Sequence, residues 1–126
     1  MAEAAAPTDL VVIVNAARGQ AALPRSFVAA VFLKKTTVWD DGATVRPVDL
    51  RPDAPIRTVF SDQILQRPLG AVRMYWEQRI FSGRDVPPLE LDSEDAVVRY
   101  VASHPEAIGY VSSGTRLVGV KAVGIL

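Results

Sequence analysis

Two places in the chain carry polar side chains where small charged ligands could bind. Asn15 and Arg18 follow a short apolar run, Leu10 to Val14, and are expected at the carboxyl end of a strand. Open α/β sheets bind ligands at that end of their strands. Asp53 and Arg57 stand at the start of a helical pattern. Helix starts bind anions through unpaired N–H groups and the positive end of the helix dipole.

Each place also has a simpler interpretation. Asn15 can stabilise a turn beside a solvated Arg18, without any ligand. Arg57 can pair with Asp53, because residues at i,i+4 spacing share one helix face. Asp53 is itself predicted as the N-cap of this helix, where its carboxylate would repel a phosphate. The sequence leaves these alternatives open.

No other group of residues predicts a catalytic or metal site. His104 is the only histidine and there is no cysteine, so a metal would lack the partners it usually needs. His104 is expected at the C-terminal end of a helix. The run Ser112 to Thr115 lacks a following helix and a lysine, which predicts a hairpin turn rather than a phosphate loop. Adjacent acids such as Glu94 and Asp95 are typical of solvated helix caps. We therefore expect no enzyme activity, no cofactor and no metal.

Composition narrows the classes of protein further. The chain has 126 residues, 49% of them hydrophobic and 22% charged, and its 14 basic residues balance its 14 acidic ones. A nucleic-acid-binding protein needs a concentrated basic surface, so this balance argues against one. The apolar run from Leu10 to Val14 is far shorter than the roughly 20 residues that span a bilayer. Residues 1–8 show no signal peptide and are expected to be disordered, with one domain over 9–126.

Periodicity predicts alternating strands and helices. Helical spacing begins at Pro24, at Asp53 to Pro55, at Leu69 and at Asp92 or Ser93, and the third of these helices places Trp76 in the core. Strand-like apolar or alternating runs separate or follow them, at 10–14, 45–50, 108–111 and 117–123. Pro47 favours a strand start or an edge strand. Strands separated by helices predict an α/β domain with a mainly parallel central sheet flanked by about four helices.

Several of these segments resemble phosphate ABC-transporter substrate-binding proteins, a family with a periplasmic binding protein-like fold. Val11 to Asn15 resembles the family's buried strand that ends in an Asn. The helix from Leu23 to Lys35, followed by Val38-Trp39, resembles its helix closing on "IFLGK" before a Trp, and Glu106 to Val111 is similar to its "GAIGYV" strand. The likeness covers roughly residues 10–123 in the right order. It implies one lobe of the two that such receptors use to enclose an anion.

The chain departs from the family where phosphate is held. The family's "Gly-Ser-Gly-Thr-Arg" corresponds to the stretch from Asp53 to Arg57, in which only Arg57 matches. Pro55 supplies no N–H, and Ala54 and Ile56 supply no hydroxyl. Each lost charge-assisted bond is worth about 1.5–3 kcal/mol, so phosphate affinity is expected to be weak or absent.

Two functions follow from this resemblance. The first is a non-catalytic module of the cell envelope that binds a small solute or anion through Asn15, Arg18, Asp53 and Arg57. A homodimer or protein partner would then complete the half-cleft, because ligand sites enclose most of a small molecule's surface. The alternative is a structural or protein-interaction module that keeps the fold without a ligand. The periplasmic or envelope location is implied by the resemblance alone.

Overall fold

The computed structural model describes residues 9–126, and the segment 1–8 that was predicted to be disordered lies outside the described residues. The described part contains six strands, four α-helices and one π-helical segment, in this order: β1 Leu10–Asn15, β2 Ala22–Leu23, α1 Arg25–Phe32, β3 Arg46–Leu50, α2 Pro55–Phe60, η1 Ser61–Leu65, α3 Leu69–Phe81, β4 Leu89–Leu91, α4 Glu94–Ser103, β5 Ala107–Ser112 and β6 Val120–Ile125.

The strands form one sheet in the order β2-β6-β1-β5-β3-β4. Strand β1 is antiparallel to both of its neighbours, β5 and β6, whereas every other pair is parallel. Five strands therefore run in one direction and β1 alone runs in the other. The predicted α/β fold with a mainly parallel sheet is confirmed, with this one exception.

The reversed strand also overturns one local prediction. Ser112 to Thr115 was expected to be a hairpin turn between the last two strands. Strands β5 and β6 do not pair with each other, because β1 lies between them. The segment is instead the start of a connection that crosses over β1. The last strand begins at Val120, not at Leu117, after Gly119 adopts a positive φ.

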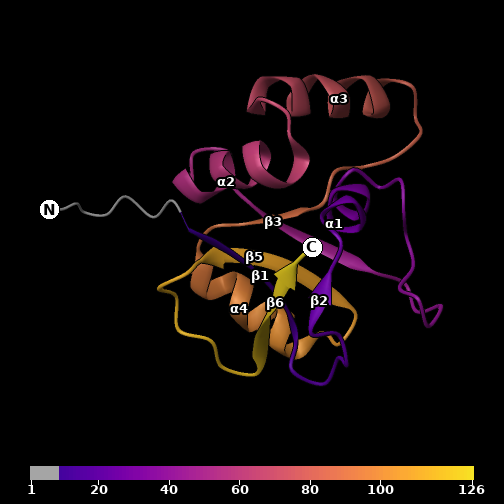
Figure 1. Cartoon of the computed structure of the whole chain (residues 1–126). Coiled ribbons are helices and arrows are strands. Elements are labelled where there is room, and N and C mark those ends of the chain that lie inside the picture. The colour runs from indigo at the N-terminus through magenta and orange to yellow at the C-terminus, as the bar shows by residue number, and fades with distance from the viewer. Residues whose placement is uncertain (1–8) are drawn as a thin grey trace, which may run out of the picture.

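Helices cover both faces of the sheet (Figure 1). Helix α4 lies on one face, against β5, β1 and β3, and α1 and α2 lie on the other. Helix α3 packs on η1 rather than on a strand, so it forms an outer layer beyond α2. Helix α3 therefore contacts the rest of the domain mainly through η1.

Both faces of β5 are tightly packed. Tyr110 faces α1 and α2, where its ring stacks on Phe60 with centroids 3.9 Å apart, and Phe60 in turn contacts Phe32 at 4.7 Å. Gly109 faces α4, and a Cβ placed there would lie 2.7 Å from Cγ1 of Val97. A side chain at 109 would push α4 outward, so glycine sets how closely this helix approaches the sheet.

The remaining differences from the sequence pattern concern short elements. Strands β2 and β4 have two and three residues, and neither was predicted. Pro47 is the second residue of β3, a strand start as predicted, although β3 is not an edge because β4 pairs beyond it. The helix after Pro55 runs to Leu65 as one α-helical and one π-helical segment. Within residues 9–126, every helix is too short or too polar to cross a bilayer.

Candidate functional site

The reversed direction of β1 separates the residues that were predicted to share one site. Asn15 pairs with Val120, the first residue of β6, whereas Asp53 and Arg57 follow Leu50, the last residue of β3. The carboxyl end of β1 therefore lies at the opposite end of the strands from the carboxyl end of β3. The structure does not bring Asn15 and Arg18 together with Asp53 and Arg57.

Asn15 and Arg18 are occupied by contacts within the protein. The buried Asn15 amide donates to the carbonyl oxygens of Val101 and Ala102 at the end of α4, and its Oδ1 accepts from the Ala17 N–H. Arg18 donates to Asp41 at 2.9 Å and its guanidinium lies 4.2 Å from the Trp39 ring centroid. These contacts support the simpler interpretation for Asn15, which stabilises a turn and joins it to α4. The expectation of a solvated Arg18 is wrong, because its side chain is only 11% exposed and is paired with Asp41 over the Trp39 ring.

The start of α2 differs from its prediction. Its N-cap is Ala54, which makes no side-chain capping bond, so the predicted N-cap role of Asp53 is wrong. Asp53 is exposed and lies 3.7 Å from Arg51. The predicted pair between Asp53 and Arg57 is also absent, because the Arg57 side chain turns toward the sheet. Proline at N1 explains why a helix can begin here without a polar cap.

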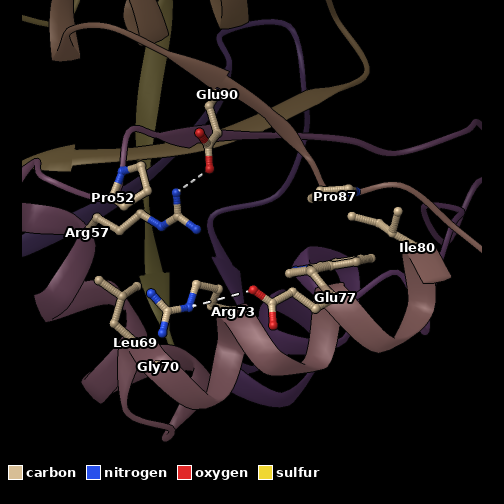
Figure 2. Close-up of a pocket in the computed structure, with 10 residues that line it drawn as sticks. Pro52, Arg57, Leu69, Gly70, Arg73, Glu77, Ile80, Pro87 and Glu90 are labelled. Atoms are coloured by element: carbon tan, nitrogen blue, oxygen red, sulfur yellow. Dashed lines mark hydrogen bonds and ion pairs between the residues drawn. The ribbon is translucent and has the colours of Figure 1, made fainter.

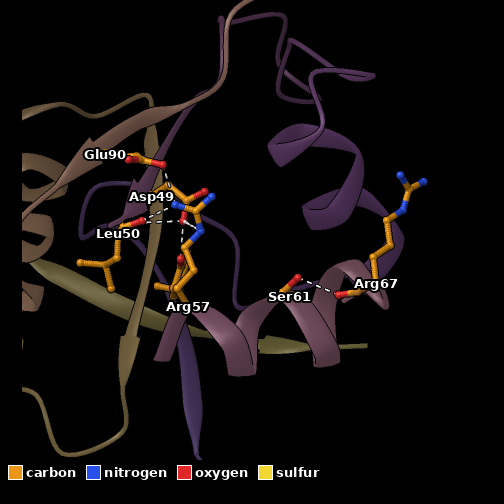
Figure 3. A network of polar contacts seen from close by, with 7 residues as sticks. Asp49, Leu50, Arg57, Ser61, Arg67 and Glu90 are labelled. Atoms are coloured by element: carbon orange, nitrogen blue, oxygen red, sulfur yellow. Dashed lines mark hydrogen bonds and ion pairs between the residues drawn. The ribbon is translucent and has the colours of Figure 1, made fainter. Parts of the chain in front are cut away.

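Arg57 lies at the centre of a partly buried network at the end of β3 (Figure 3). Its Nη1 donates to the Leu50 carbonyl and to Glu90 Oε2, both at 2.6 Å, and its Nε lies 3.5 Å from Asp49 Oδ1. Asp49 also accepts from the Leu50 N–H and from the hydroxyl of Tyr110. The guanidinium is thus committed to two carboxylates and a carbonyl.

The charges in this network depend on one another. Asp49 and Glu90 stand at paired positions on the parallel strands β3 and β4, where like charges repel. Burial raises the pKa of the Asp49 carboxyl, and Glu90 adds to this, whereas Arg57 and the Tyr110 hydroxyl act against it. Burial opposes the charge on Arg57, but Asp49 and Glu90 outweigh it and raise the pKa of the guanidinium. Arg57 therefore holds two neighbouring carboxylates together.

Sequence reasoning missed Asp49 and Glu90. A signal for Asp49 exists, since it interrupts an otherwise apolar run after Val48, and a buried aspartate nearly always has a partner. Glu90 is 33 residues from Arg57, and its strand of three residues follows Pro87-Pro88, so no local pattern predicts the contact.

A second internal carboxylate occupies the polar end of β5. Glu94, in the first turn of α4, accepts from the Ser112 N–H and Oγ at 2.5 Å and from Thr115 Oγ1 at 2.9 Å. Burial alone would raise the pKa of Glu94, but these hydrogen bonds outweigh it and lower the pKa. Ser93 caps α4 by accepting from the Ala96 N–H, as predicted. Ser112 and Thr115 therefore already have an internal acceptor.

The surface above these groups is acidic. An open depression of about 600 Å³ lies where the β3 end, the α2 start and the α4 start meet, and among its described lining residues four are carboxylates and one is a guanidinium: Asp53, Asp92, Glu94, Asp95 and Arg116. The formal charge of this lining is −3, which opposes a phosphate.

His104 lies at the C-cap of α4, as predicted, with its ring stacked 3.9 Å from that of Tyr100. Its Nδ1 is 2.8 Å from the Tyr100 carbonyl oxygen. Among residues 9–126 there is no cluster of three or more His, Asp or Glu side chains that could hold a metal. The contacts of His104 are those of a residue that ends a helix.

Removal of Arg57 should destabilise the protein through its carboxylate partners. Arg57→Leu is expected to lower the free energy of unfolding by about 3 kcal/mol, because it leaves buried Asp49 uncompensated beside Glu90. The double variant with Asp49→Asn should recover at least about 1 kcal/mol of that loss. Urea unfolding measures both. Arg51 is an exposed cation that lies 3.7 Å from Asp53 and 3.6 Å from Asp92. Its replacement, Arg51→Leu, is the control and should change the free energy of unfolding by less than about 1 kcal/mol. Additive effects of the first two changes would contradict this coupling.

Glu94 should make stability depend on pH in the acid range. Its folded pKa is below the ordinary value of 4.5, so its contribution is present above pH 4.5 and is lost as the pH falls through the lowered pKa. Glu94→Gln is expected to cost about 1 kcal/mol at pH 7, after allowance for partial exposure. Urea unfolding at several pH values should show this difference shrinking toward zero below pH 4.5. A difference that stays constant, or one that Asp92→Asn reproduces, would refute the assignment.

Comparison with known proteins extends these observations. No protein-family model matches the chain, and no curated protein matches its sequence. Solved structures match by fold. They include an ABC-type phosphate transport receptor from Vibrio cholerae, with 18% identity, a TM-score of 0.66 and coverage of 93% of this chain and 46% of that one. They also include a phosphate ABC transporter substrate-binding protein from Clostridium perfringens, solved with bound phosphate. It has 17% identity and a TM-score of 0.73, and the match covers 93% of this chain and 44% of that one.

PstS from Borrelia burgdorferi matches in the same way, with 10% identity, a TM-score of 0.69 and coverage of 93% of this chain and 47% of that chain. This chain spans less than half the length of each of these proteins. At these identities the likeness shows the fold. The resemblance noted in the sequence is therefore confirmed for the fold, which is that of one lobe of a phosphate-transporter substrate-binding protein.

Proposed function

We propose, starting from the fold of a phosphate-receptor lobe, that this chain is a non-catalytic binding module of the cell envelope that has lost affinity for free phosphate. The envelope location rests on the resemblance to transport receptors. The single observation that carries the proposal is the internal commitment of Arg57, the one residue of the 53–57 stretch that matches the family's phosphate loop. Asp49, Glu90 and the Leu50 carbonyl take the place of an external oxyanion.

The other groups at this edge support the same conclusion. Pro55 removes one N–H from the start of α2, and Ala54 adds no hydroxyl. Ser112 and Thr115 donate to Glu94. A phosphate that approached the depression would meet a lining of net charge −3 and would have to displace bonds already formed. Internal carboxylates thus satisfy the donors, and the fold persists without the anion.

Phosphate titration tests this proposal directly. Isothermal titration calorimetry with inorganic phosphate and with sulfate, at low salt, should give no saturable heat at millimolar ligand. The double variant Asp92→Asn, Asp95→Asn removes two carboxylates from the depression and is expected to bind phosphate at least as well as the wild type. Saturable binding by the wild-type protein at micromolar phosphate would overturn the proposal.

A second candidate function is a protein-interaction module, and a separate observation favours it. Large apolar side chains are exposed along α3 and the segment that follows it, with Phe81 95% exposed and Val86 65% exposed. Met74 and Ile80 are also exposed on α3, and Leu89 is exposed at the start of β4. Exposed apolar side chains gathered on neighbouring segments are typical of protein contact sites. We call these five residues the α3 apolar surface.

Self-association is the simplest form of contact through the α3 apolar surface. Light scattering after size exclusion should give a mass above 13.6 kDa that rises with protein concentration. The double variant Phe81→Ser, Val86→Ser should return the protein to the monomer mass. Leu126→Ser, which removes an exposed apolar side chain on a different element, is the control and should leave association unchanged. A wild-type protein that stays monomeric at every concentration would count against the homodimer.

A further inference from the structure

A cavity of about 320 Å³ lies between α3 and the sheet edge formed by β4 (Figure 2). Its size falls at the lower end of the roughly 300–1,000 Å³ range of small-molecule sites. It exists because α3 packs on η1 and not on the strands, so the helix spans a space beside β4 without filling it. Gly70, in the first turn of α3, has no atom within 4 Å of an added Cβ and leaves that end of the cavity open.

The walls of the cavity are mainly apolar. Leu69, Trp76 and Ile80 come from α3, and Pro52 and Pro87 come from the loops on the opposite side. Trp76 lines the cavity and is almost fully buried, and its ring makes an edge-on contact with that of Tyr75, at 5.1 Å between ring centroids. A rigid aromatic wall beside proline and aliphatic side chains suits a flat ring.

The charged residues at the rim cancel one another. Arg57 pairs with Glu90 at 2.6 Å and Arg73 pairs with Glu77 at 3.9 Å, so the four charges that line the cavity sum to zero. A charged ligand would have no unmatched partner there and would lose hydration on entry. These matched charges favour an uncharged ligand.

Arg57 leaves one nitrogen, Nη2, for such a ligand. Its hydrogen bonds and ion pairs within residues 9–126 use Nη1 and Nε. Figure 2 shows the guanidinium directed into the space between Glu90 and Arg73. The remaining Nη2 group is therefore placed to donate to an acceptor that sits on the apolar wall.

We propose that this cavity binds an uncharged, mainly apolar molecule that contains a ring and one hydrogen-bond acceptor, with the ring against Trp76 and the acceptor toward Arg57. The site is separate from the depression at the start of α2. Both proposals use the same orientation of Arg57, but the result of the phosphate titration does not decide whether this cavity binds a ligand.

Three small probes test the chemistry of this site: benzamide has a ring and a neutral acceptor, toluene lacks the acceptor, and benzoate carries a negative charge. Proton–nitrogen NMR of the labelled protein resolves the indole N–H of Trp76. Benzamide should shift this signal saturably, in the millimolar range typical of a probe with about nine heavy atoms, and should bind more tightly than toluene or benzoate. Trp39, which is buried elsewhere and donates to the Glu106 carbonyl at 3.0 Å, is an internal reference that should not shift.

Substitution at Gly70 tests the location. Gly70→Phe should fill the cavity and weaken benzamide binding at least tenfold, while the fold is kept because the position is open and helical. Gly70→Ala is the matched control and should keep the binding of the wild type. Gly70→Leu provides a smaller filling if the aromatic variant unfolds. The proposal is overturned if no probe shifts Trp76 saturably, if the filled variant binds as the wild type does, or if benzoate binds as tightly as benzamide.

Discussion

The arrangement of α2, β3 and β4 depends on one interaction, the ion pair between Arg57 and Asp49. Asp49 is a carboxylate inside the sheet, where an unpaired charge would be very costly. Glu90 on the neighbouring strand adds a second negative charge beside it. Without the guanidinium between them, the two carboxylates would repel each other and Asp49 would be a buried, unpaired charge. Helix α2 must begin where Arg57 can reach the end of β3, and β4 must pair where Glu90 can reach Arg57.

This requirement is the physical basis of the proposed loss of phosphate affinity. In a binding site, donors at a helix start are left unsatisfied until the ligand arrives, and this lowers stability in its absence. In this chain, three side-chain donors at this end of the sheet, those of Arg57, Ser112 and Thr115, have partners from within the protein. Asp49 and Glu90 hold Nε and Nη1 of Arg57, and Glu94 accepts from Ser112 and Thr115. In the proposed function, these internal carboxylates take the place of the anion.

The sequence predicted what depends on local pattern. Apolar spacing located the four helices, Ser93 was one of the two residues expected to cap the last of them, and Trp76 was placed in the core. The direction of β1 was not predictable in this way, because the run Leu10 to Val14 would read the same in either orientation. Its reversal requires knowledge of which strands lie beside it, and that is set by long-range pairing with β5 and β6.

The candidate site was harder to predict for the same reason. Asn15 and Arg57 were grouped on the assumption that the carboxyl ends of all strands lie on one side of the sheet. Because β1 alone is antiparallel, the two residues lie at opposite ends of the strands. The partner of Arg57 was expected four residues away on the same helix, where Asp53 stands. An ion pair stabilises exposed Asp53 very little, because water already solvates its charge. Buried Asp49 has lost that solvation, so its charge needs a partner within the protein. Burial, which one sequence does not show, decided between them.

The two surfaces around Arg57 are linked by the geometry of its side chain. A guanidinium offers five donors in a plane, and they point in different directions. Because Nε and Nη1 are directed to Asp49, Leu50 and Glu90, the group is turned away from the start of α2 and toward α3. That rotation removes the cation from the depression where the remaining lining is acidic, and it places the cation in the wall of the apolar cavity beside Trp76. A substitution that freed Arg57 from Asp49 would therefore change both surfaces together, whereas one that filled the space at Gly70 would change the cavity alone.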